Sequence, residues 1–305
     1  MKSKFLLILP LFAIHSIIRW ICVLAILFLL VRCTEDEMPD ENPNHPDQTE
    51  TGSWVVYSPY KWTHDGRPYH SVHCTVFSDG ASDEIKELSG KFTDDKFIEI
   101  LELFDFTDLQ DLKYPTERKE IDVYINTGHP ENIAAAYWGS IFITVKRPSL
   151  DTARYAYLFK HELTHQFEFL VEGTVNLAAD MWFTEGIAVY GAGGLNRINT
   201  VGDLESWITE NEQSSNKGNP ITIRKWEDYP EGADKTGYYT VFEVVMEYML
   251  DPNGLDRSLQ DVLNLFYDLR ELTPFDESFE NHFGISVDEL ENDIFDRLRD
   301  YLGPD

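Results

Sequence analysis

The chain has 305 residues, of which 43% are apolar and 13% aromatic. This composition excludes a disordered chain and allows one large domain or two small ones. Acidic residues outnumber basic residues by 54 to 25, which gives a formal net charge of −29. A surface this acidic repels a phosphate backbone, so we expect no nucleic-acid partner.

Residues 1–33 have the composition of a targeting segment. They carry basic side chains and two apolar stretches separated by Arg19, and neither stretch reaches the roughly 20 residues of a comfortable membrane span. Cys33 follows, and acidic residues come directly after it. This arrangement resembles the signal of Gram-negative lipoproteins, in which the cysteine is lipidated and becomes the mature N-terminus. Arg32 stands where a small residue is usual, so an uncleaved N-terminal anchor is the alternative.

The resemblance predicts a lipid-anchored protein of the cell envelope, at the outer membrane and exposed at the surface. Residues 34–52 are rich in proline, asparagine and acid, which predicts a flexible, self-repelling tether. The folded part, 53–305, holds one cysteine, Cys74, and therefore no internal disulfide. We expect Cys74 to be a buried, unreactive thiol.

In chain order, the sequence of the folded part predicts strands and a helix at first and mostly helices after them. Strand-like runs occur at 70–77, at 121–126, which alternates and is β-branched, and at 134–145, with a bulge or close approach at Gly139 and Ser140. Helical spacing favours helices at 82–104 with a break near Gly90, from Ser149 or Asp151 to about 171, and at 182–190, 238–250, 258–272 and 287–301. This order predicts an α+β domain in which a lobe of residues 53–172 meets a mainly helical lobe of residues 173–305 across a cleft.

The helix that ends near residue 171 contains the sequence HELTH, residues 161–165. His161 and His165 lie about 40° apart around the helix axis, so both imidazoles can bind one ion, and zinc suits such ligands. Glu162 is rotated by about 100° from His161 and can reach a water on the metal, which is the place of a general base. The apolar surroundings predict a buried helix, in which these three side chains are costly without a metal. The alternative is a pair of surface histidines beside a solvated glutamate.

A second motif, WFTEGIAVY, occupies residues 182–190. Glu185 lies among apolar and small residues on a second predicted buried helix, and we expect Gly186 and Ala188 to let this helix approach the first. The carboxylate of Glu185 would complete a His-His-Glu zinc site. Glu172 and Asp180 are the alternative third ligands.

HELTH followed by WFTEGIAVY resembles the gluzincin metallopeptidases, above all their aminopeptidase-type branch and its bacterial peptidase MA-like relatives. In that family the second motif reads W-x-x-E-G-x-A-x-Y, and its glutamate is the third zinc ligand. The resemblance implies a zincin-type fold with an active-site cleft and one zinc ion per chain, held by His161, His165 and Glu185. It also implies Glu162 as the base, and a peptide or protein as the substrate.

Residues 238–250 resemble the family's helix that begins with a catalytic tyrosine. Tyr239 has Tyr248 and Met249 nine and ten positions later, as the family pattern requires, so Tyr239 is a better candidate than Tyr238. Its phenol would donate a hydrogen bond to the oxyanion of a tetrahedral intermediate. The alternative is a core tyrosine without a catalytic role.

Two departures from the family pattern limit what the resemblance implies. The strand at 136–141 lacks the glutamate that holds the substrate amine in the aminopeptidases, so the choice between endopeptidase and exopeptidase stays open. This strand can still pair with an extended peptide. Val189 stands where some gluzincins have an aspartate that orients a zinc histidine, so another group must do so here.

Two functions follow from these patterns. The first is a zinc metallopeptidase on a lipid tether. The second is a surface binding lipoprotein that retains a zincin fold without catalysis, which the missing amine anchor favours and the intact Glu162 disfavours.

Overall fold

The computed structural model describes residues 66–118, 120–127, 134–144, 152–174, 178–233 and 235–303. They belong to the second of two compact units of the chain, Val55–Asp305. The predicted signal segment, the tether and Cys33 lie outside the described residues. Within the described part, no helix is long and apolar enough to cross a membrane.

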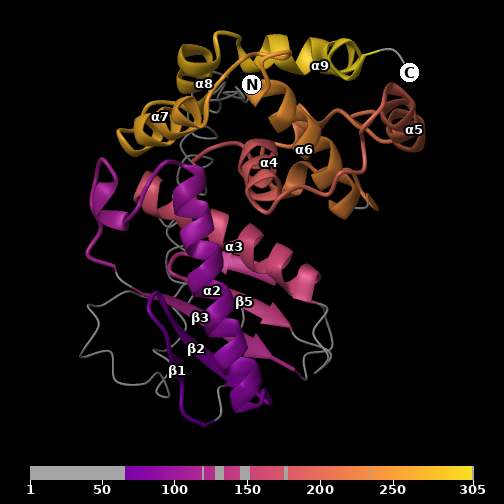
Figure 1. The fold of residues 1–305 in the computed structure, drawn as a ribbon. Coiled ribbons are helices and arrows are strands. Elements are labelled where there is room, and N and C mark those ends of the chain that lie inside the picture. Colours follow the sequence, from indigo (N-terminus) through magenta and orange to yellow (C-terminus); the bar gives the residue numbers. More distant parts are fainter. Residues whose placement is uncertain are drawn as a thin grey trace, which may run out of the picture. The chain divides into compact units, whose positions relative to one another are not determined.

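Five strands form a mixed sheet in the order β1-β2-β3-β5-β4 (Figure 1). The three inner strands are parallel to one another, and the two outer strands run antiparallel to their neighbours. Side chains of the inner strands are nearly all buried, as parallel strands require. The strands are β1 (Tyr69–His70), β2 (Cys74–Asp79), β3 (Ile121–Asn126), β4 (Ala134–Tyr137) and β5 (Ser140–Thr144).

Two segments predicted as single strands are hairpins instead. Residues 70–77 were expected to form one strand, but the chain reverses between β1 and β2, where Asp94 of the following helix accepts hydrogen bonds from Val72 N and His73 N. The expected strand 134–145 divides into β4 and β5 at a turn in which Gly139 has φ +79°. A continuous run of strand-forming residues is compatible with one long strand and with two strands joined by a tight turn, so the pattern did not distinguish them.

Helices α2 (Asp83–Leu103) and α3 (Thr152–Glu172) pack against each other and against the sheet. The break predicted near Gly90 is wrong, because α2 runs through it. A Cβ at Gly90 would lie 2.5 Å from the ring of Tyr69, so this glycine serves the close approach of β1 and not a bend. Aromatic rings join the two helices, with Phe104 stacked on Phe167 at 4.4 Å between centroids.

The rest of the described chain is helical, as predicted. Two of these helices, α5 and α8, are not among the expected ranges, and α6 begins a few residues earlier than its apolar pattern. The helices are α4 (Met181–Gly191), α5 (Val201–Asn211), α6 (Lys235–Leu250), α7 (Leu259–Arg270), α8 (Phe275–Phe283) and α9 (Val287–Leu302), with 3₁₀ turns at Leu109–Asp111, Pro220–Thr222 and Trp226–Asp228.

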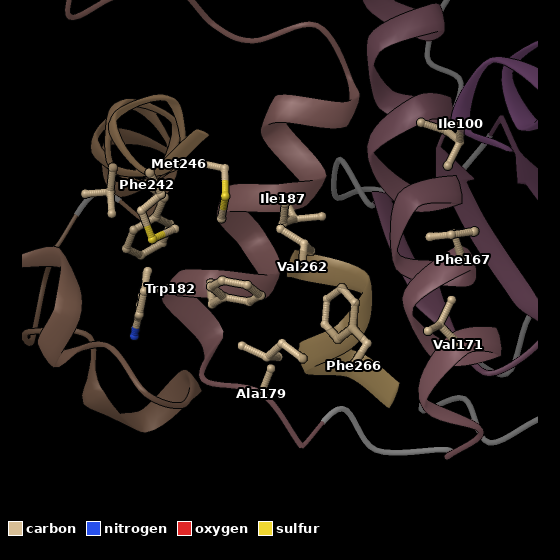
Figure 2. Packing of buried hydrophobic residues seen from close by; sticks show 14 of the residues in the cluster. Ile100, Phe167, Val171, Ala179, Trp182, Ile187, Phe242, Met246, Val262 and Phe266 are labelled. Atoms are coloured by element: carbon tan, nitrogen blue, oxygen red, sulfur yellow. The ribbon is translucent and has the colours of Figure 1, made fainter. Parts of the chain in front are cut away.

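Helix α4 lies in the middle of the core and contacts both α3 and α6. Its Trp182 and Phe183 are fully buried. Figure 2 shows Trp182 and Ile187 of α4, with Phe242 and Met246 of α6 on one side and Phe167 of α3 on the other. The predicted α+β class is confirmed. Apolar packing on both sides of α4 holds this helix in place against α3, which carries the HELTH segment.

Candidate metal centre

Helix α3 carries a buried stripe of ionisable side chains. His161, His165, Glu168 and Glu172 follow one another at intervals of three or four residues and therefore share one face. Their exposed fractions are 6%, 8%, 0% and 2%. The opposite face carries Leu163 and other apolar residues that contact α2 and the sheet. A buried polar stripe inside an apolar helix requires partners for its charges.

Helix α4 supplies the carboxylate that meets the two histidines. Oε2 of Glu185 lies 3.2 Å from Nε2 of His161 and 3.5 Å from Nε2 of His165. The three side chains are buried, and their ligand atoms all lie within 4.8 Å of one another. Among the described residues, this is the one group of three or more histidine, cysteine or acidic side chains arranged in this way.

The close approach of α3 and α4 depends on a glycine, although not the predicted one. Gly186 faces α6, where an added Cβ would lie 3.1 Å from the backbone oxygen of Phe242. Gly191, at the end of α4, faces α3 instead, and a Cβ there would lie 2.6 Å from Oγ1 of Thr164. The contact at Gly191 therefore sets the distance between the HELTH turn and the helix of Glu185.

The three residues fit a divalent cation. Oε2 of Glu185 is buried and accepts no hydrogen bond, although two imidazole nitrogens lie beside it. Burial raises the pKa of Glu185, but the two histidines outweigh burial and hold that pKa well below its usual range. Burial likewise opposes a proton on His165, but Glu168 and Glu185 raise its pKa well above the ordinary value. A field that favours protons among these ligands also favours a cation, and two imidazoles with one carboxylate are a known catalytic zinc set.

Glu168 orients His165, and sequence reasoning did not find it. Nδ1 of His165 lies 2.8 Å from Oε2 of Glu168, whose side chain is fully buried. This bond leaves Nε2 of His165 for the metal and fixes the ring, the role that Val189 cannot perform. The sequence signal that could have found it is its spacing, because Glu168 comes three residues after His165 on the same predicted helix.

Glu162 is buried beside the same group, with an exposed fraction of 4%. Burial raises its pKa, and the two histidines lower it. His161 directly precedes Glu162 in the chain, so the carboxyl lies on the same turn of α3 as this histidine. A carboxyl with a raised pKa, next to a cation site, has the properties of a general base.

The two candidate tyrosines face different surroundings. The ring of Tyr239 lies 5.7 Å from the ring of His161. Burial, with Glu185 and Glu162 nearby, raises the pKa of Tyr239, so its hydroxyl stays a hydrogen-bond donor. Tyr238 is fully buried on the other side of α6, where its hydroxyl donates to Oδ1 of Asn216 at 3.0 Å. Of these two tyrosines, Tyr239 is the one beside the candidate metal centre.

The alternative third ligands have other partners. Oε2 of Glu172 accepts a hydrogen bond from Ala178 N at 2.9 Å. Asp180 lies 3.2 Å from the guanidinium of Arg224 and accepts a hydrogen bond from Trp182. Neither carboxylate belongs to the His161, His165 and Glu185 group.

A surface hollow of about 660 Å³ is lined by α5, by the residues that precede α6, and by the first turns of α6. The residues that line it lie between Arg197 and Thr240 in the sequence, and none of them is a candidate metal ligand. We therefore do not assign it to the metal centre, and the cleft predicted between the two lobes stays a prediction.

Comparisons with known proteins give only distant likenesses. No protein-family model and no curated protein matches the sequence. Similar solved structures include a two-domain M1 zinc metallopeptidase bound to L-arginine, with 11% identity, a TM-score of 0.39, and coverage of 78% of this chain and 51% of that one. Another is a conserved protein of unknown function from Bacillus anthracis, with 10% identity, a TM-score of 0.41, and coverage of 75% and 52%. The chain spans about half the length of each, and likenesses this weak carry no argument about activity.

Proposed function

We propose that this chain is a zinc metallopeptidase with a zincin-type fold. The observation that carries the proposal is the convergence of His161, His165 and Glu185, with a buried carboxylate oxygen that accepts no hydrogen bond. The buried Glu162 beside them adds the group that hydrolysis needs and that a metal site with only a structural role does not.

In this proposal His161 and His165 bind one zinc ion through Nε2, and Glu185 binds it through Oε2. The ion supplies a Lewis acid that polarises a carbonyl and acidifies water. Glu168 holds His165 in the required tautomer through its 2.8 Å contact with Nδ1. Because the ligands come from two helices packed in the core, they need little rearrangement to receive the ion.

Glu162 and Tyr239 perform the proton transfers and the charge stabilisation. The carboxylate of Glu162 takes a proton from the attacking water and delivers it to the nitrogen of the leaving amine. The Tyr239 hydroxyl donates a hydrogen bond to the peptide oxygen, where negative charge develops. The raised pKa of Tyr239 keeps that proton on the phenol throughout.

The proposed substrate is a peptide or protein segment bound in extended form along β4. This strand lies at the end of the sheet and packs against α3, the helix that carries His161 and Glu162. An extended chain can add to such an edge by backbone hydrogen bonds. Residues 136–141 offer no carboxylate for a free amine, so peptides with free and with blocked N-termini must both be tested.

The test is metal analysis of the purified full-length chain together with cleavage of a mixed fluorogenic peptide library. We expect one zinc per chain and cleavage that a chelator abolishes. Glu185→Ala should lose zinc, and Glu162→Gln should keep zinc but cleave about 10²–10⁴-fold more slowly. Zinc without any cleavage would favour the non-catalytic binding lipoprotein, and equal rates for Glu162→Gln and wild type would exclude Glu162 as the base.

The proposed setting is the cell envelope, with a lipid on Cys33 as the membrane anchor. Only the sequence of residues 1–37 supports it. Mass spectrometry of the mature N-terminus in a Gram-negative host tests it, with Cys33→Ser as the control. An unmodified N-terminal segment that stays attached to the domain would favour the uncleaved anchor.

A further inference from the structure

The side-chain amide of Gln166 connects the metal-binding helix to the turn between β4 and β5. Its Oε1 accepts a hydrogen bond from Gly139 N at 2.8 Å. Its Nε2 donates to Tyr137 O at 2.8 Å and to Ser140 O at 3.0 Å. Gln166 is 2% exposed, and it directly follows His165 in the chain. Both ends of one buried amide therefore form hydrogen bonds to three residues of one hairpin turn.

A second buried side chain holds the same turn. The Arg118 guanidinium donates a hydrogen bond to Gly139 O, and its Nε donates to Glu120 O at 2.8 Å. A Cβ at Gly139 would overlap that guanidinium at 1.8 Å, and φ at Gly139 is +79°. Only glycine fits this position, so the turn is held between Gln166 and Arg118 in one conformation.

The turn has a defined place relative to the metal ligands. Gln166 lies four residues after Glu162, so the two side chains share one face of α3. The hairpin that Gln166 holds therefore lies on the side of α3 that carries the proposed base. A rigid helix connects this hairpin to His161 and His165, and a shift of the hairpin would change the distance from β4 to the metal centre.

We propose that Gln166 is a positioning residue that holds edge strand β4 at a fixed distance from the metal-binding turn of α3. An extended peptide on β4 then lies in register with the metal centre. This inference rests on the proposed function. Gln166 touches neither metal nor substrate in this scheme. It acts through the β4–β5 turn. When that turn is no longer held, β4 is less well preorganised to pair with an extended peptide, so the peptide should bind more weakly.

The test uses full-length Gln166→Met, which keeps the volume and removes all three hydrogen bonds. We expect the amide of Gly139 to exchange about tenfold faster, as the loss of one or two net hydrogen bonds implies. Zinc affinity should stay within about twofold of wild type, because no ligand changes. For the library peptide that wild type cleaves fastest, KM should rise about tenfold and kcat should change less than about twofold.

Thr93→Val is the matched control. Thr93 is fully buried and donates one side-chain hydrogen bond to Ser89 O within α2. The control should lose comparable stability and leave Gly139 exchange and KM unchanged. Gln166→Asn, which keeps the amide but is too short to reach the turn, repeats the test if Gln166→Met does not fold.

Each outcome separates the two proposals. Unchanged Gly139 exchange in the variant would overturn the positioning role, whether or not the chain is a peptidase. Faster exchange with unchanged KM and kcat would also overturn it. If wild type cleaves no peptide, the proposed function fails, and β4 is then tested by binding of fluorescently labelled casein. Equal casein affinity for wild type and Gln166→Met would overturn the positioning role.

Discussion

Nδ1 of His165 and Oε2 of Glu168 lie 2.8 Å apart on one buried face of α3. Because Glu168 takes one ring nitrogen, the other nitrogen of His165 faces Glu185 on the neighbouring helix. A carboxylate paired in this way makes the imidazole a more basic ligand. Glu168 is not a candidate ligand, but this contact should give it a measurable effect on the affinity of the centre for a metal ion.

Glu168→Ala should weaken zinc binding about 10–100-fold, because His165 loses its fixed orientation while all three ligands remain. Competition with a fluorescent chelator at constant pH measures the affinity. Glu172→Gln is the control, since Glu172 lies one turn further along the same buried stripe and bonds Ala178 instead. Equal affinities for Glu168→Ala and wild type would show that the contact does not support the metal.

Tyr239→Phe should lower kcat about a hundredfold and leave zinc content unchanged, because one donor to the developing charge is removed. Tyr238→Phe should instead leave kcat unchanged. It loses the 3.0 Å hydrogen bond to Asn216, which should cost about 1 kcal/mol of stability. Steady-state kinetics and thermal unfolding of the pair check this. A larger kcat loss in Tyr238→Phe would reverse the assignment.

Gly191→Ala should destabilise the chain, although alanine is the better helix former by up to about 1 kcal/mol. The added Cβ would lie 2.6 Å from Oγ1 of Thr164, and overpacking of this kind costs about 1–3 kcal/mol. Thr164→Ala removes the atoms that the added Cβ would overlap. The double variant should therefore lose less free energy of unfolding than the two single variants lose together. Denaturant unfolding of the four proteins measures the coupling, and strict additivity would contradict the proposed contact.

Stability should fall as the pH rises from 5 to 8 partly because of Glu172. Burial raises the pKa of Glu172 to about 8, above its value in the unfolded chain. In this window the folded chain keeps a proton that the unfolded chain has released, so each pH step favours unfolding. The contribution is roughly 3–4 kcal/mol across the window.

Glu172→Gln cannot titrate and should flatten that decline. The comparison of wild type and variant by urea unfolding at pH 5, 6, 7 and 8, with EDTA present, isolates the effect from pH-dependent metal binding. Parallel curves for the two proteins would mean that Glu172 is ionised in the folded chain.

The sequence predicted most of the helices, and it singled out the three side chains that the structure brings together, because both depend on local spacing. His161 and His165 are one turn apart, and Glu185 stands out as an acid within an apolar helix, so neither required knowledge of the fold. The α+β order could be read in the same way.

Contacts between distant segments could not be predicted in this way. The hairpin at Gly139 depends on Arg118 and Gln166, which meet it only in the folded chain. The close approach to α3 was assigned to Gly186 instead of Gly191, because a helix sequence shows which residues are small and not which neighbour each one faces. Glu168 was missed because its spacing from His165, the one local signal, is shared by carboxylates that face solvent and orient nothing.

The candidate metal centre joins segments that are close in sequence. Only about twenty positions separate His165 from Glu185, so an ion bound to both closes a short loop, for which the entropy cost is small and grows only slowly with loop length. Such a centre can be completed as soon as α3 and α4 meet, before the last helices have docked. During synthesis from the ribosome, zinc could therefore act as an early nucleation point for the helical part, and the availability of zinc would then influence the yield of folded chain as well as its activity.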